Sequence, residues 1–175
     1  MDDSKGKKIV ITGAAGFIGS HTTEELAKQN TVFAIDNVND YYDKNQKREN
    51  IKIIKDAGVT FERRDIRDTT TYDSIVDFNP DIIIHLAAMA GVRWSLKKPK
   101  KYIDVNVTGT QNILSAAKET GSYTILASSS SVYGARKDAP FSEKDSVEEQ
   151  VSPYAATKRC TELLAQVHNH LYDLP

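Results

Sequence analysis

The sequence predicts an α/β fold built on a doubly wound parallel sheet. Along its 175 residues, short apolar runs alternate with longer amphipathic stretches, which is the pattern of βαβ units. The first apolar run leads into a glycine-rich turn at 13–19 that directly precedes a helical stretch, and a carboxylate, Asp36, ends the second run. A turn and an acid placed in this way are typical of a Rossmann sheet.

Five strands are expected, each short and rich in β-branched residues, at 7–12, 31–35, 60–63, 81–86 and 123–127. Amphipathic stretches predict helices at 17–29, 46–57, 69–78, 100–120 and 152–171. Gly121 is expected to end the fourth helix in the left-handed conformation, while Ser152 and Pro153 begin the last one. Segment 37–45 is unusually polar and aromatic, and the polar segment 135–151 is expected to be a loop.

The chain is interpreted as one domain, residues 1–175, because it has no internal repeat and no low-complexity linker. A doubly wound dinucleotide fold usually has six or more strands. The sequence ends after the helix that would precede a sixth strand, so we expect the domain to lack its last strand or strands.

The composition argues against several classes of partner. The formal net charge of −1 gives no reason to expect a nucleic-acid partner or an anionic membrane surface. The one dense basic run, at 97–101, is interpreted as a solvated helix start. The single cysteine, Cys160, cannot form an internal disulfide, and the chain has neither a signal-like N-terminus nor a membrane-length apolar run. We therefore expect a cytoplasmic protein with no membrane partner and no metal site.

The glycine turn indicates a bound dinucleotide. Gly13, Gly16 and Gly19 follow a G-x-x-G-x-x-G spacing between a strand and a helix. Glycines at these positions let the backbone turn tightly and approach a pyrophosphate, whose charge meets the helix N-terminus. Asp36 lies where a ribose-binding carboxylate is expected. Because a carboxylate repels a 2′-phosphate, it favours NAD over NADP.

Two further strand ends lie at the edge where open α/β sheets bind ligands. Asp65 and Ile66 follow the third strand, and the segment 85–88, His-Leu-Ala-Ala, ends the fourth. The two alanines are small, as a backbone close to a cofactor requires. The histidine is interpreted as a packed, hydrogen-bonded residue without a chemical role.

Near the end of the chain, Tyr154 and Lys158 are four residues apart and share one face of the last helix. A tyrosine, with an ordinary pKa of about 10, is a poor base at neutral pH. A nearby ammonium and a positive nicotinamide ring favour its phenolate, which suits the pair to removing a proton from a hydroxyl group. The serine run 128–131 lies at a strand end, where a hydroxyl can hold the substrate oxygen. With the glycine turn, these residues indicate nicotinamide redox chemistry on a hydroxyl.

The motifs resemble those of the extended short-chain dehydrogenase/reductase family over essentially the whole chain. They are Thr-Gly-x-x-Gly-x-x-Gly at 12–19, Asp-Ile at 65–66, His-Leu-Ala-Ala at 85–88, Asn106 in a helix, Ser-Ser-Ser-Ser-Val-Tyr-Gly at 128–134 and Tyr-x-x-x-Lys at 154–158. The resemblance implies an NAD-binding domain whose cofactor contacts fall on Gly13, Ala15, Gly16, Phe17, Ile18, Asp36, Asn37, Asp65, Ile66, Leu86, Ala87, Ala88, Asn106, Tyr154 and Lys158.

Within that family the chain is most similar to nucleotide-sugar 4-epimerases of the UDP-glucuronate type. The similar stretches are Asp-Asn-Val-Asn-Asp-Tyr-Tyr-Asp at 36–43, Lys-Arg at 47–48, Ala-Gly-Val-Arg-Trp-Ser at 90–95 and Tyr-Ala-Ala-Thr-Lys at 154–158. Nucleotide-sugar 4,6-dehydratases carry an Asp-Glu pair where this chain has serines at 129–131. No acid is therefore available here for elimination of water.

The resemblance implies epimerisation of a UDP-sugar at C4 through a transient 4-keto intermediate, with Ser129, Tyr154 and Lys158 as catalytic residues. Tyr154 would take the proton of the sugar 4-hydroxyl while NAD takes the hydride from C4, and the hydride would return to the other face of the turned sugar. Ser129 would polarise the 4-oxygen. Substrate contacts are implied for Ala90, Arg93, Ser129 and Ser130, although Arg93 could equally make a surface ion pair.

Members of that family continue with a sixth strand and a C-terminal substrate domain, which is absent here, so we expect little activity from this chain alone. Three functions stay open: a UDP-glucuronate 4-epimerase, a stand-alone NAD-binding module or fragment without turnover, and a 4-epimerase of UDP-glucose or UDP-N-acetylglucosamine. The family dimerises through two helices that match 100–120 and 152–171, so a homodimer is a further expectation.

Overall fold

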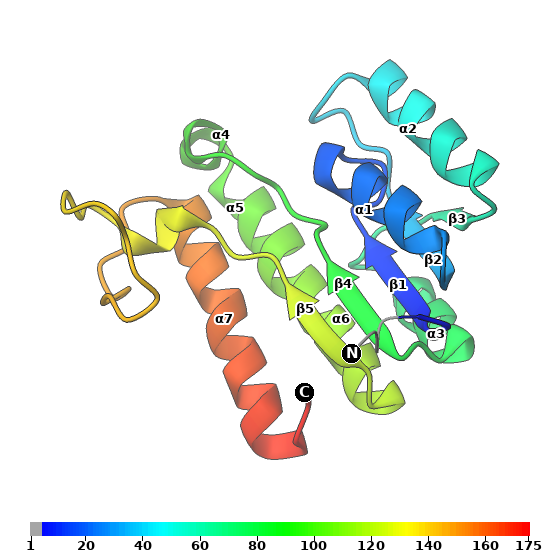
Figure 1. Ribbon diagram of the computed structural model, residues 1–175. Helices are drawn as coiled ribbons and strands as arrows, with labels where there is room; N and C mark the ends of the chain where they lie inside the picture. Colours follow the sequence, from blue (N-terminus) through cyan, green and yellow to red (C-terminus); the bar gives the residue numbers. More distant parts are fainter. Residues whose placement is uncertain (1–4) are drawn as a thin grey trace.

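Five parallel strands form the centre of the protein (Figure 1). The computed structural model describes residues 5–175, and residues 1–4 of the predicted domain lie outside the described part. The strands are β1 (Lys8–Thr12), β2 (Thr31–Asp36), β3 (Thr60–Arg63), β4 (Ile82–His85) and β5 (Tyr123–Leu126), in the spatial order β3-β2-β1-β4-β5. The predicted parallel sheet is confirmed, with strand ends that differ by no more than about one residue.

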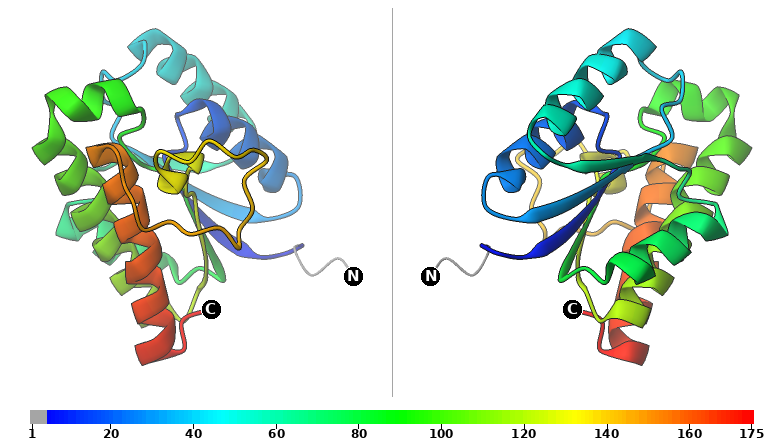
Figure 2. Two further views of the ribbon diagram at one scale, coloured as in Figure 1. Left: turned by 90° about the vertical axis from the view of Figure 1, so that its left-hand side faces the viewer. Right: turned by 90° about the vertical axis from the view of Figure 1, so that its right-hand side faces the viewer.

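Helices cover both faces of this sheet, as the edge-on views in Figure 2 show. On one face lie α1 (Phe17–Ala27) and α2 (Lys44–Asp56), which pack against each other, and on the other lie α3 (Thr69–Phe78), α6 (Gly109–Thr120) and α7 (Pro153–Tyr172). The chain builds outward from β1 to β3 and then returns to place β4 beside β1. Such a reversal creates a crevice at the carboxyl ends of the two strands, where doubly wound folds bind ligands.

Alternating side chains along the strands fill the core on both sides of the sheet. Ile9 and Ile11 of β1 belong to the cluster beneath α1 and α2, whereas Val10 belongs to the cluster beneath α3 and α6, with Ile75 and Ile113. All five are at most 1% exposed. Burial of an aliphatic side chain of this size contributes about 1.5–3 kcal/mol. The two-sided core therefore explains why β1 has apolar side chains at three consecutive positions, 9–11.

The predicted helix 100–120 is present, but it is not regular. The helix α5 (Pro99–Tyr102) continues into a π-helical segment, Ile103–Thr108, and then into α6, which ends at Gly121 with φ 67°, as predicted. A π turn departs from the i→i−4 hydrogen bonds of an α-helix, and such turns are frequent at functional sites. A further short helix, α4 (Val92–Lys97), was not predicted.

The segment between β5 and α7 is mostly irregular, as predicted for 135–151. A short 3₁₀-helix, η2 (Ser130–Tyr133), follows β5, and the loop after it extends away from the sheet (Figure 1). Ser152 caps α7 as predicted, because its side chain accepts a hydrogen bond from the Ala155 N–H at 3.1 Å.

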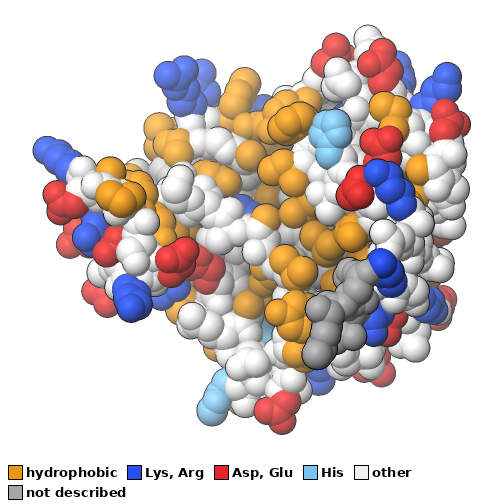
Figure 3. Space-filling model, in the orientation of Figure 1, with side chains coloured by type: hydrophobic (Ala, Val, Ile, Leu, Met, Phe, Trp, Pro, Cys, Tyr) orange, Lys and Arg blue, Asp and Glu red, His pale blue; other side chains and the backbone are white. Residues whose placement is uncertain are grey.

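Within the described residues, 5–175, helices leave one part of the sheet uncovered. On the face that carries α1 and α2, apolar side chains over β4 and β5 reach the surface (Figure 3). Tyr123 and Ile125 of β5 are 54% and 46% exposed there. At the edge of β5, the Thr124 N–H donates to the carbonyl oxygen of Pro175 at 2.8 Å. The chain beyond α7 therefore returns alongside β5.

Candidate functional site

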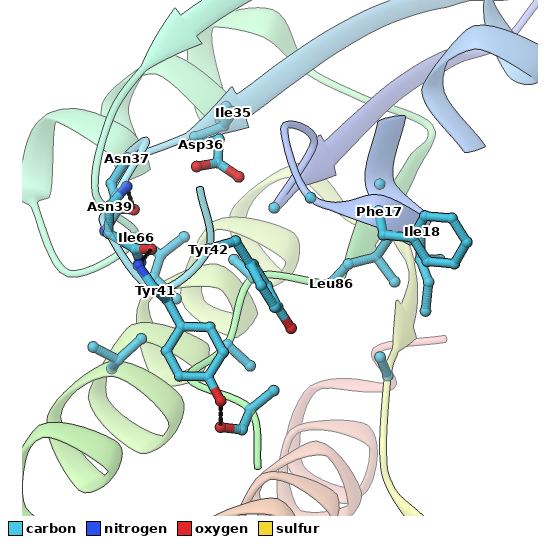
Figure 4. Close-up of a pocket in the computed structure, with 18 of the residues that line it drawn as sticks. Phe17, Ile18, Ile35, Asp36, Asn37, Asn39, Tyr41, Tyr42, Ile66 and Leu86 are labelled. Carbon is cyan, nitrogen blue, oxygen red and sulfur yellow. Dashed lines mark hydrogen bonds between the residues drawn. The ribbon is translucent and has the colours of Figure 1, made fainter. Parts of the chain in front are cut away.

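A cleft of about 300 Å³ opens at the carboxyl edge of the sheet (Figure 4). It is lined by the β1–α1 turn, the ends of β2 and β4, the loop after β2 and the first turns of α7. The predicted site residues that line it are Gly13, Gly16, Phe17, Ile18, Asp36, Asn37, Ile66, Leu86, Ala87, Ala88, Ala90, Tyr154 and Lys158.

The glycine turn is too tightly packed to accept side chains. Gly13 has φ 75°, a left-handed conformation that favours glycine, and a Cβ there would lie 2.7 Å from the Ala87 nitrogen. A Cβ on Gly19 would lie 2.1 Å from the Gly13 carbonyl oxygen. The turn is closed by a hydrogen bond from the Gly16 N–H to the same oxygen, at 3.0 Å. These contacts hold the start of α1 against the end of β4.

The N-terminus of α1 presents its first backbone N–H groups to the cleft. The first amides of a helix have no partners within it, and Gly16, at the N-cap position, has no side chain to accept from them. Phe17 and Ile18 are 77% and 65% exposed, and Figure 4 shows them on the wall opposite Asp36 and Asn37. A helix start of this kind fits a pyrophosphate, because its donors and dipole favour negative charge.

Asp36 lies at the end of β2, and both of its carboxylate oxygens accept hydrogen bonds. One carboxylate oxygen accepts from the Ala15 N–H at 3.2 Å, and the other accepts from the Val38 N–H at 2.7 Å and from Lys47 Nζ at 3.1 Å. The Asp36 and Lys47 side chains are 6% and 7% exposed. Lys47 also donates to the Asn39 side chain at 3.3 Å. A buried ion pair therefore supports the predicted ribose-binding carboxylate.

Asp65 does not line the cleft but supports a residue that does. Its carboxylate accepts from Arg67 Nε and Nη2, both at 2.8 Å, and from the side-chain amide of Asn37 at 2.9 Å. The Arg67 guanidinium holds the pKa of Asp65 well below its usual range. The neighbouring Ile66 lines the cleft, whereas Asp65 orients Asn37 within it.

The loop 37–43 crosses from β2 toward the segment after β4. Side-chain oxygens of Asn37 and Asn39 accept from backbone N–H groups two residues ahead, which stiffens the loop. The Tyr41 hydroxyl then donates to the Ala90 carbonyl oxygen, an interaction marked in Figure 4. Tyr102 of α5 donates to the same oxygen. Two phenols from distant parts of the chain thus fix one carbonyl.

Tyr102 connects this carbonyl to the predicted catalytic tyrosine. Its side chain is fully buried, and its ring meets the Tyr154 ring edge-on with centroids 6.1 Å apart. Burial, followed by the contact with Tyr41, raises the pKa of Tyr102, so its hydroxyl stays a neutral donor. A carbonyl oxygen has two lone pairs, and the two phenols occupy both on Ala90.

Tyr154 and Lys158 lie in the first turns of α7 and both line the cleft. The Lys158 ammonium donates to the Ala127 carbonyl oxygen at the end of β5, at 2.7 Å. Lys158 is only 7% exposed, and burial lowers its pKa to about 8. It therefore remains mostly protonated at neutral pH.

The remaining predicted site residues are outside the cleft lining. Ser129 caps η2, because its hydroxyl oxygen accepts from the Ser131 N–H at 3.2 Å, and Ser130 is exposed. Arg93 is exposed in α4. Ala15 is fully buried beneath the turn.

Asn106 is buried in the π-helical segment and has its hydrogen bonds inside the protein. Its side chain accepts from the Met89 N–H at 2.7 Å and donates to the Met89 carbonyl and the Thr157 hydroxyl, both at 3.0 Å. It therefore joins the segment after β4 to α7, next to Lys158, and does not open into the cleft.

Several residues that line the cleft were not among the predicted site residues: Ile35, Asn39, Tyr41, Tyr42, Lys47, Arg64, Val105 and Ala127. Gly19 and Ser128 also line it, and they belong to the predicted glycine turn and serine run. Asn39, Tyr41 and Tyr42 belong to segment 37–45, which already stood out by its polar and aromatic composition. That composition, next to Asp36, was the signal that could have identified them. Arg64 and Val105 carry no such signal in the sequence.

His85 is a packed residue, as predicted. Its two ring nitrogens contact the Thr12 and Thr110 hydroxyl oxygens at 2.6 and 3.0 Å. Complete burial lowers its pKa to about 3, so the ring is neutral at physiological pH. It joins β1, β4 and α6 directly below the cleft.

Residues 5–175 contain no group of three or more potential metal ligands that lie together. None of the helices in this part of the chain is long and apolar enough to cross a membrane.

Comparison with known proteins gives a consistent result. Protein CapI of Staphylococcus aureus is 43% identical over 171 residues, which are 96% of this chain and 51% of that protein. UDP-glucuronate 4-epimerase 3 of Arabidopsis thaliana is 38% identical over 97% of this chain and 40% of its own length. The chain spans about half the length, or less, of these curated relatives.

Solved structures agree with the fold. The UDP-glucuronic acid 4-epimerase of Bacillus cereus, in complex with UDP-glucuronic acid and NAD, superimposes with a TM-score of 0.88 at 36% identity, over 96% of this chain and 54% of that one. The UDP-glucose 4-epimerase of Thermus thermophilus, in complex with NAD, gives a TM-score of 0.81 at 32% identity, over 95% of this chain and 52% of that one.

A family model also matches almost the whole chain. The model described as GDP-mannose 4,6 dehydratase matches residues 10–175, which include the glycine turn, the ends of β2 and β4, the serine run and the Tyr154–Lys158 pair. The chain therefore belongs to the GDP-mannose 4,6 dehydratase family, within the extended short-chain dehydrogenases/reductases.

Proposed function

We propose that this chain is the NAD-binding and proton-transferring portion of an epimerase that inverts C4 of a UDP-sugar, with UDP-glucuronate as the favoured substrate. One observation carries the proposal: Tyr154 and Lys158 line the same cleft as the glycine turn and Asp36. Similar proteins of about twice the length are named as UDP-sugar 4-epimerases. The activity is proposed for this portion joined to a substrate-binding portion, and little is expected from the chain alone.

The cleft suits NAD in three respects. The glycine turn has no space for a Cβ, so backbone can approach a pyrophosphate closely. The start of α1 supplies donors and a favourable dipole, and Asp36 is fixed in place to accept from ribose hydroxyls. Bound there, NAD supplies the acceptor and then the donor of the hydride that leaves and re-enters C4.

The protein's own part is proton transfer and positioning. Tyr154 takes the proton of the sugar 4-hydroxyl during oxidation and returns it during reduction. The buried Lys158 cation lies on the same helix face and places a positive charge in the cleft where the proton is transferred. Ser129 accepts a hydrogen bond from the Ser131 N–H, which leaves its hydroxyl hydrogen free to donate to the sugar 4-oxygen.

Substrate contacts are proposed more narrowly than the sequence suggested. Because two phenols occupy the Ala90 carbonyl oxygen, Ala90 can meet a sugar only through its N–H or its methyl group. Ser130 and Arg93 are exposed, and Arg93 forms no ion pair with another described residue. Both are therefore available to a substrate that carries a carboxylate.

Two alternatives keep the same cleft. One is a 4-epimerase of UDP-glucose or UDP-N-acetylglucosamine, since structures of both kinds of enzyme are similar to this chain. The other is an NAD-binding module without turnover. The second is disfavoured by the intact Tyr154–Lys158 pair in the cleft, which simple cofactor storage does not need.

We also propose a homodimer through the helices of 100–120 and 152–171. Apolar side chains at their surfaces support it: Ile103, Leu163, Val167 and Leu171 are about half exposed. A cytoplasmic location is proposed because the only cysteine, Cys160, is free.

Calorimetry on this chain tests the cofactor. NAD is expected to bind, and NADP is expected to bind at least about tenfold more weakly, because its 2′-phosphate meets the Asp36 carboxylate. Failure of NAD to bind would exclude both the epimerase and the NAD-binding module.

A chimera tests the reaction. Residues 1–175 are joined to the remaining part of the Bacillus cereus enzyme, and interconversion of UDP-glucuronate and UDP-galacturonate is followed. The chimera is expected to turn over, and its Tyr154→Phe variant to lose activity by at least about a hundredfold. A chimera that binds NAD and converts UDP-glucose but not UDP-glucuronate would move the assignment to the first alternative.

A further inference from the structure

Three polar side chains follow one another along a single face of α7. Tyr154, Lys158 and Glu162 are spaced by four residues, so they lie one turn apart. The first two line the cleft, whereas Glu162 has no part in the chemistry proposed above. A hydrogen bond to Ser128 nevertheless connects Glu162 to the neighbouring Ser129, and its charge acts on Lys158.

Successive turns of α7 hold successive residues at the end of β5. Lys158 donates to the Ala127 carbonyl oxygen at 2.7 Å, and one turn later the Glu162 carboxylate accepts from the Ser128 hydroxyl. The other Glu162 oxygen accepts from Arg159 Nη1 at 3.0 Å. Since the Arg159 and Glu162 side chains are only about a quarter exposed, this charge-assisted arrangement is stronger than a fully solvated one.

The segment held in this way leads directly into Ser129. The backbone of Ser129 is extended, with φ −158° and ψ 145°, and its hydroxyl oxygen already serves as the cap of η2. The place of the Ser129 hydroxyl therefore depends on two anchors, η2 on one side and the Ser128–Glu162 hydrogen bond on the other.

We propose that Glu162 is a positioning residue that fastens segment 127–129 to the helix carrying Tyr154 and Lys158 and keeps a negative charge beside the Lys158 ammonium. Its value to catalysis rests on the proposed function. The fastening and the charge are properties of the folded chain and do not depend on that function.

The Glu162 charge raises the pKa of Lys158. Burial lowers the pKa of Lys158 to about 8, and the Glu162 carboxylate opposes this. The other titratable groups near Lys158 are Tyr154 on α7 and His85 on β4, and His85 stays neutral because burial lowers its pKa to about 3. Without Glu162, the Lys158 ammonium would be lost closer to neutral pH.

Nuclear magnetic resonance of the 175-residue chain with ¹³C-labelled lysine tests the charge. Glu162→Gln removes the charge and keeps the shape, and the Lys158 titration is expected to move to lower pH by about half a pH unit or more. Glu162→Asp keeps the charge, so most of this shift in the Lys158 titration midpoint is expected to disappear. The matched control is Glu119→Gln, an exposed carboxylate on α6, which is expected to leave it unchanged.

Hydrogen exchange tests the fastening. Ser128→Ala and Glu162→Ala are both expected to speed exchange of the amides of 129–131 by about threefold or more, while Ser128→Ala leaves the Lys158 midpoint in place. The proposal is overturned if Glu162→Gln titrates like the wild type, or if neither alanine variant changes exchange in a chain that remains folded. These readouts need neither NAD nor turnover, so a failed NAD titration would reject the proposed function and leave this result standing.

Discussion

The two sides of the cleft are built in different ways. One side, called the ribose side because Asp36 is proposed to bind the ribose of NAD, consists of Asp36, loop 37–43 and Lys47. It is held by buried hydrogen bonds and by an ion pair that is almost completely removed from water. The other side, called the catalytic side because proton transfer is proposed there, consists of segment 127–134 and the first turns of α7. Its serines are exposed or partly exposed, and it contains one buried lysine. A long irregular loop follows segment 127–134 directly.

The difference shows which part of the site the described chain completes by itself. On the ribose side, every oxygen of Asp36 already has a partner from this chain, so the carboxylate is fixed before any ligand arrives. On the catalytic side, Ser129 and Ser130 lie outside the cleft lining. The side proposed to bind the cofactor is therefore preorganised, whereas the side proposed to meet the sugar is open.

The largest expected effect comes from breaking the ribose side at its ion pair. Lys47→Met leaves the Asp36 carboxylate buried without its cation, and this is expected to reduce the free energy of unfolding by about 3–5 kcal/mol in urea denaturation. Lys52→Met, at an exposed position of the same helix, is the matched control and should change little.

A double variant separates charge from packing at this site. Asp36→Asn combined with Lys47→Met removes both charges, so most of the lost stability should return. If the double variant is as unstable as Lys47→Met alone, the pair is held by packing and not by charge.

The next effect concerns His85, which lies below both sides of the cleft. An unfolded histidine binds its proton near pH 6.5, whereas burial lowers the pKa of His85 to about 3. Its contribution to stability is therefore complete above pH 6.5 and is lost as the pH falls toward 3. Between pH 7 and pH 5 the free energy of unfolding is expected to fall by about 2 kcal/mol for this reason.

The measurement is the pH dependence of urea unfolding in the wild type and in His85→Asn. The variant should lose that part of the slope, while His170→Asn, at an exposed position on α7, should keep it. Burial also lowers the pKa of His168, but that contribution is common to all three proteins. Equal slopes in the wild type and His85→Asn would contradict the prediction.

A smaller effect is expected where the ribose side is tied to the segment after β4. Tyr41→Phe removes one of two donors to the Ala90 carbonyl and is expected to cost about 1 kcal/mol. With the loop less firmly held, affinity for NAD measured by calorimetry should fall about fivefold. Tyr123→Phe, which changes an exposed tyrosine on β5, is the control. Unchanged affinity in Tyr41→Phe would mean that the loop holds its place without this hydrogen bond.

The smallest effect is expected from an ion pair on the loop that follows the catalytic side. Arg136 Nη2 lies 3.2 Å from Asp145 Oδ1, and the two side chains are 36% and 18% exposed. Water screens such a pair, so Arg136→Gln should change the free energy of unfolding by less than about 1 kcal/mol. A loss as large as that of Lys47→Met would remove the contrast between the two sides.

The fold could be predicted closely because its signals are local. A glycine turn after an apolar run, a carboxylate at the end of the next run and Gly121 after a helix each depend on a few neighbouring residues. The sheet then follows from the general rules of βαβ connection. This is why the strands and most helix ends agree with the structure.

The burial of Lys47 could not be predicted in the same way. It lies in a helix whose neighbours are charged and polar, Lys-Asn-Gln-Lys-Arg-Glu-Asn at 44–50, which is the composition of a solvated face. Its burial depends on Asp36, eleven residues earlier, and on the path of the loop between them. No local pattern contains that information.

Asn106 and Ser129 illustrate a similar limit. Family resemblance brings both into the candidate site, but their contacts depend on how three segments meet in space. Asn106 joins Met89 to Thr157, and Ser129 is bound by η2. A motif identifies such residues without showing which of their atoms already form hydrogen bonds within the protein.

The π-helical segment 103–108 has a consequence for how this helix is compared with others. A π turn contains one more residue than an α turn, so the faces of the helix before and after it are out of phase by one position. Tyr102 before the segment and Thr110 after it both reach the buried interior, where they contact Ala90 and His85. Removing one residue between them would give an ordinary α-helix, and it would also rotate one of these contacts away from the site. The extra residue therefore sets the rotation of the second half of the helix relative to the first half. An alignment that treats this residue as a gap would assign half of the helix to the wrong face.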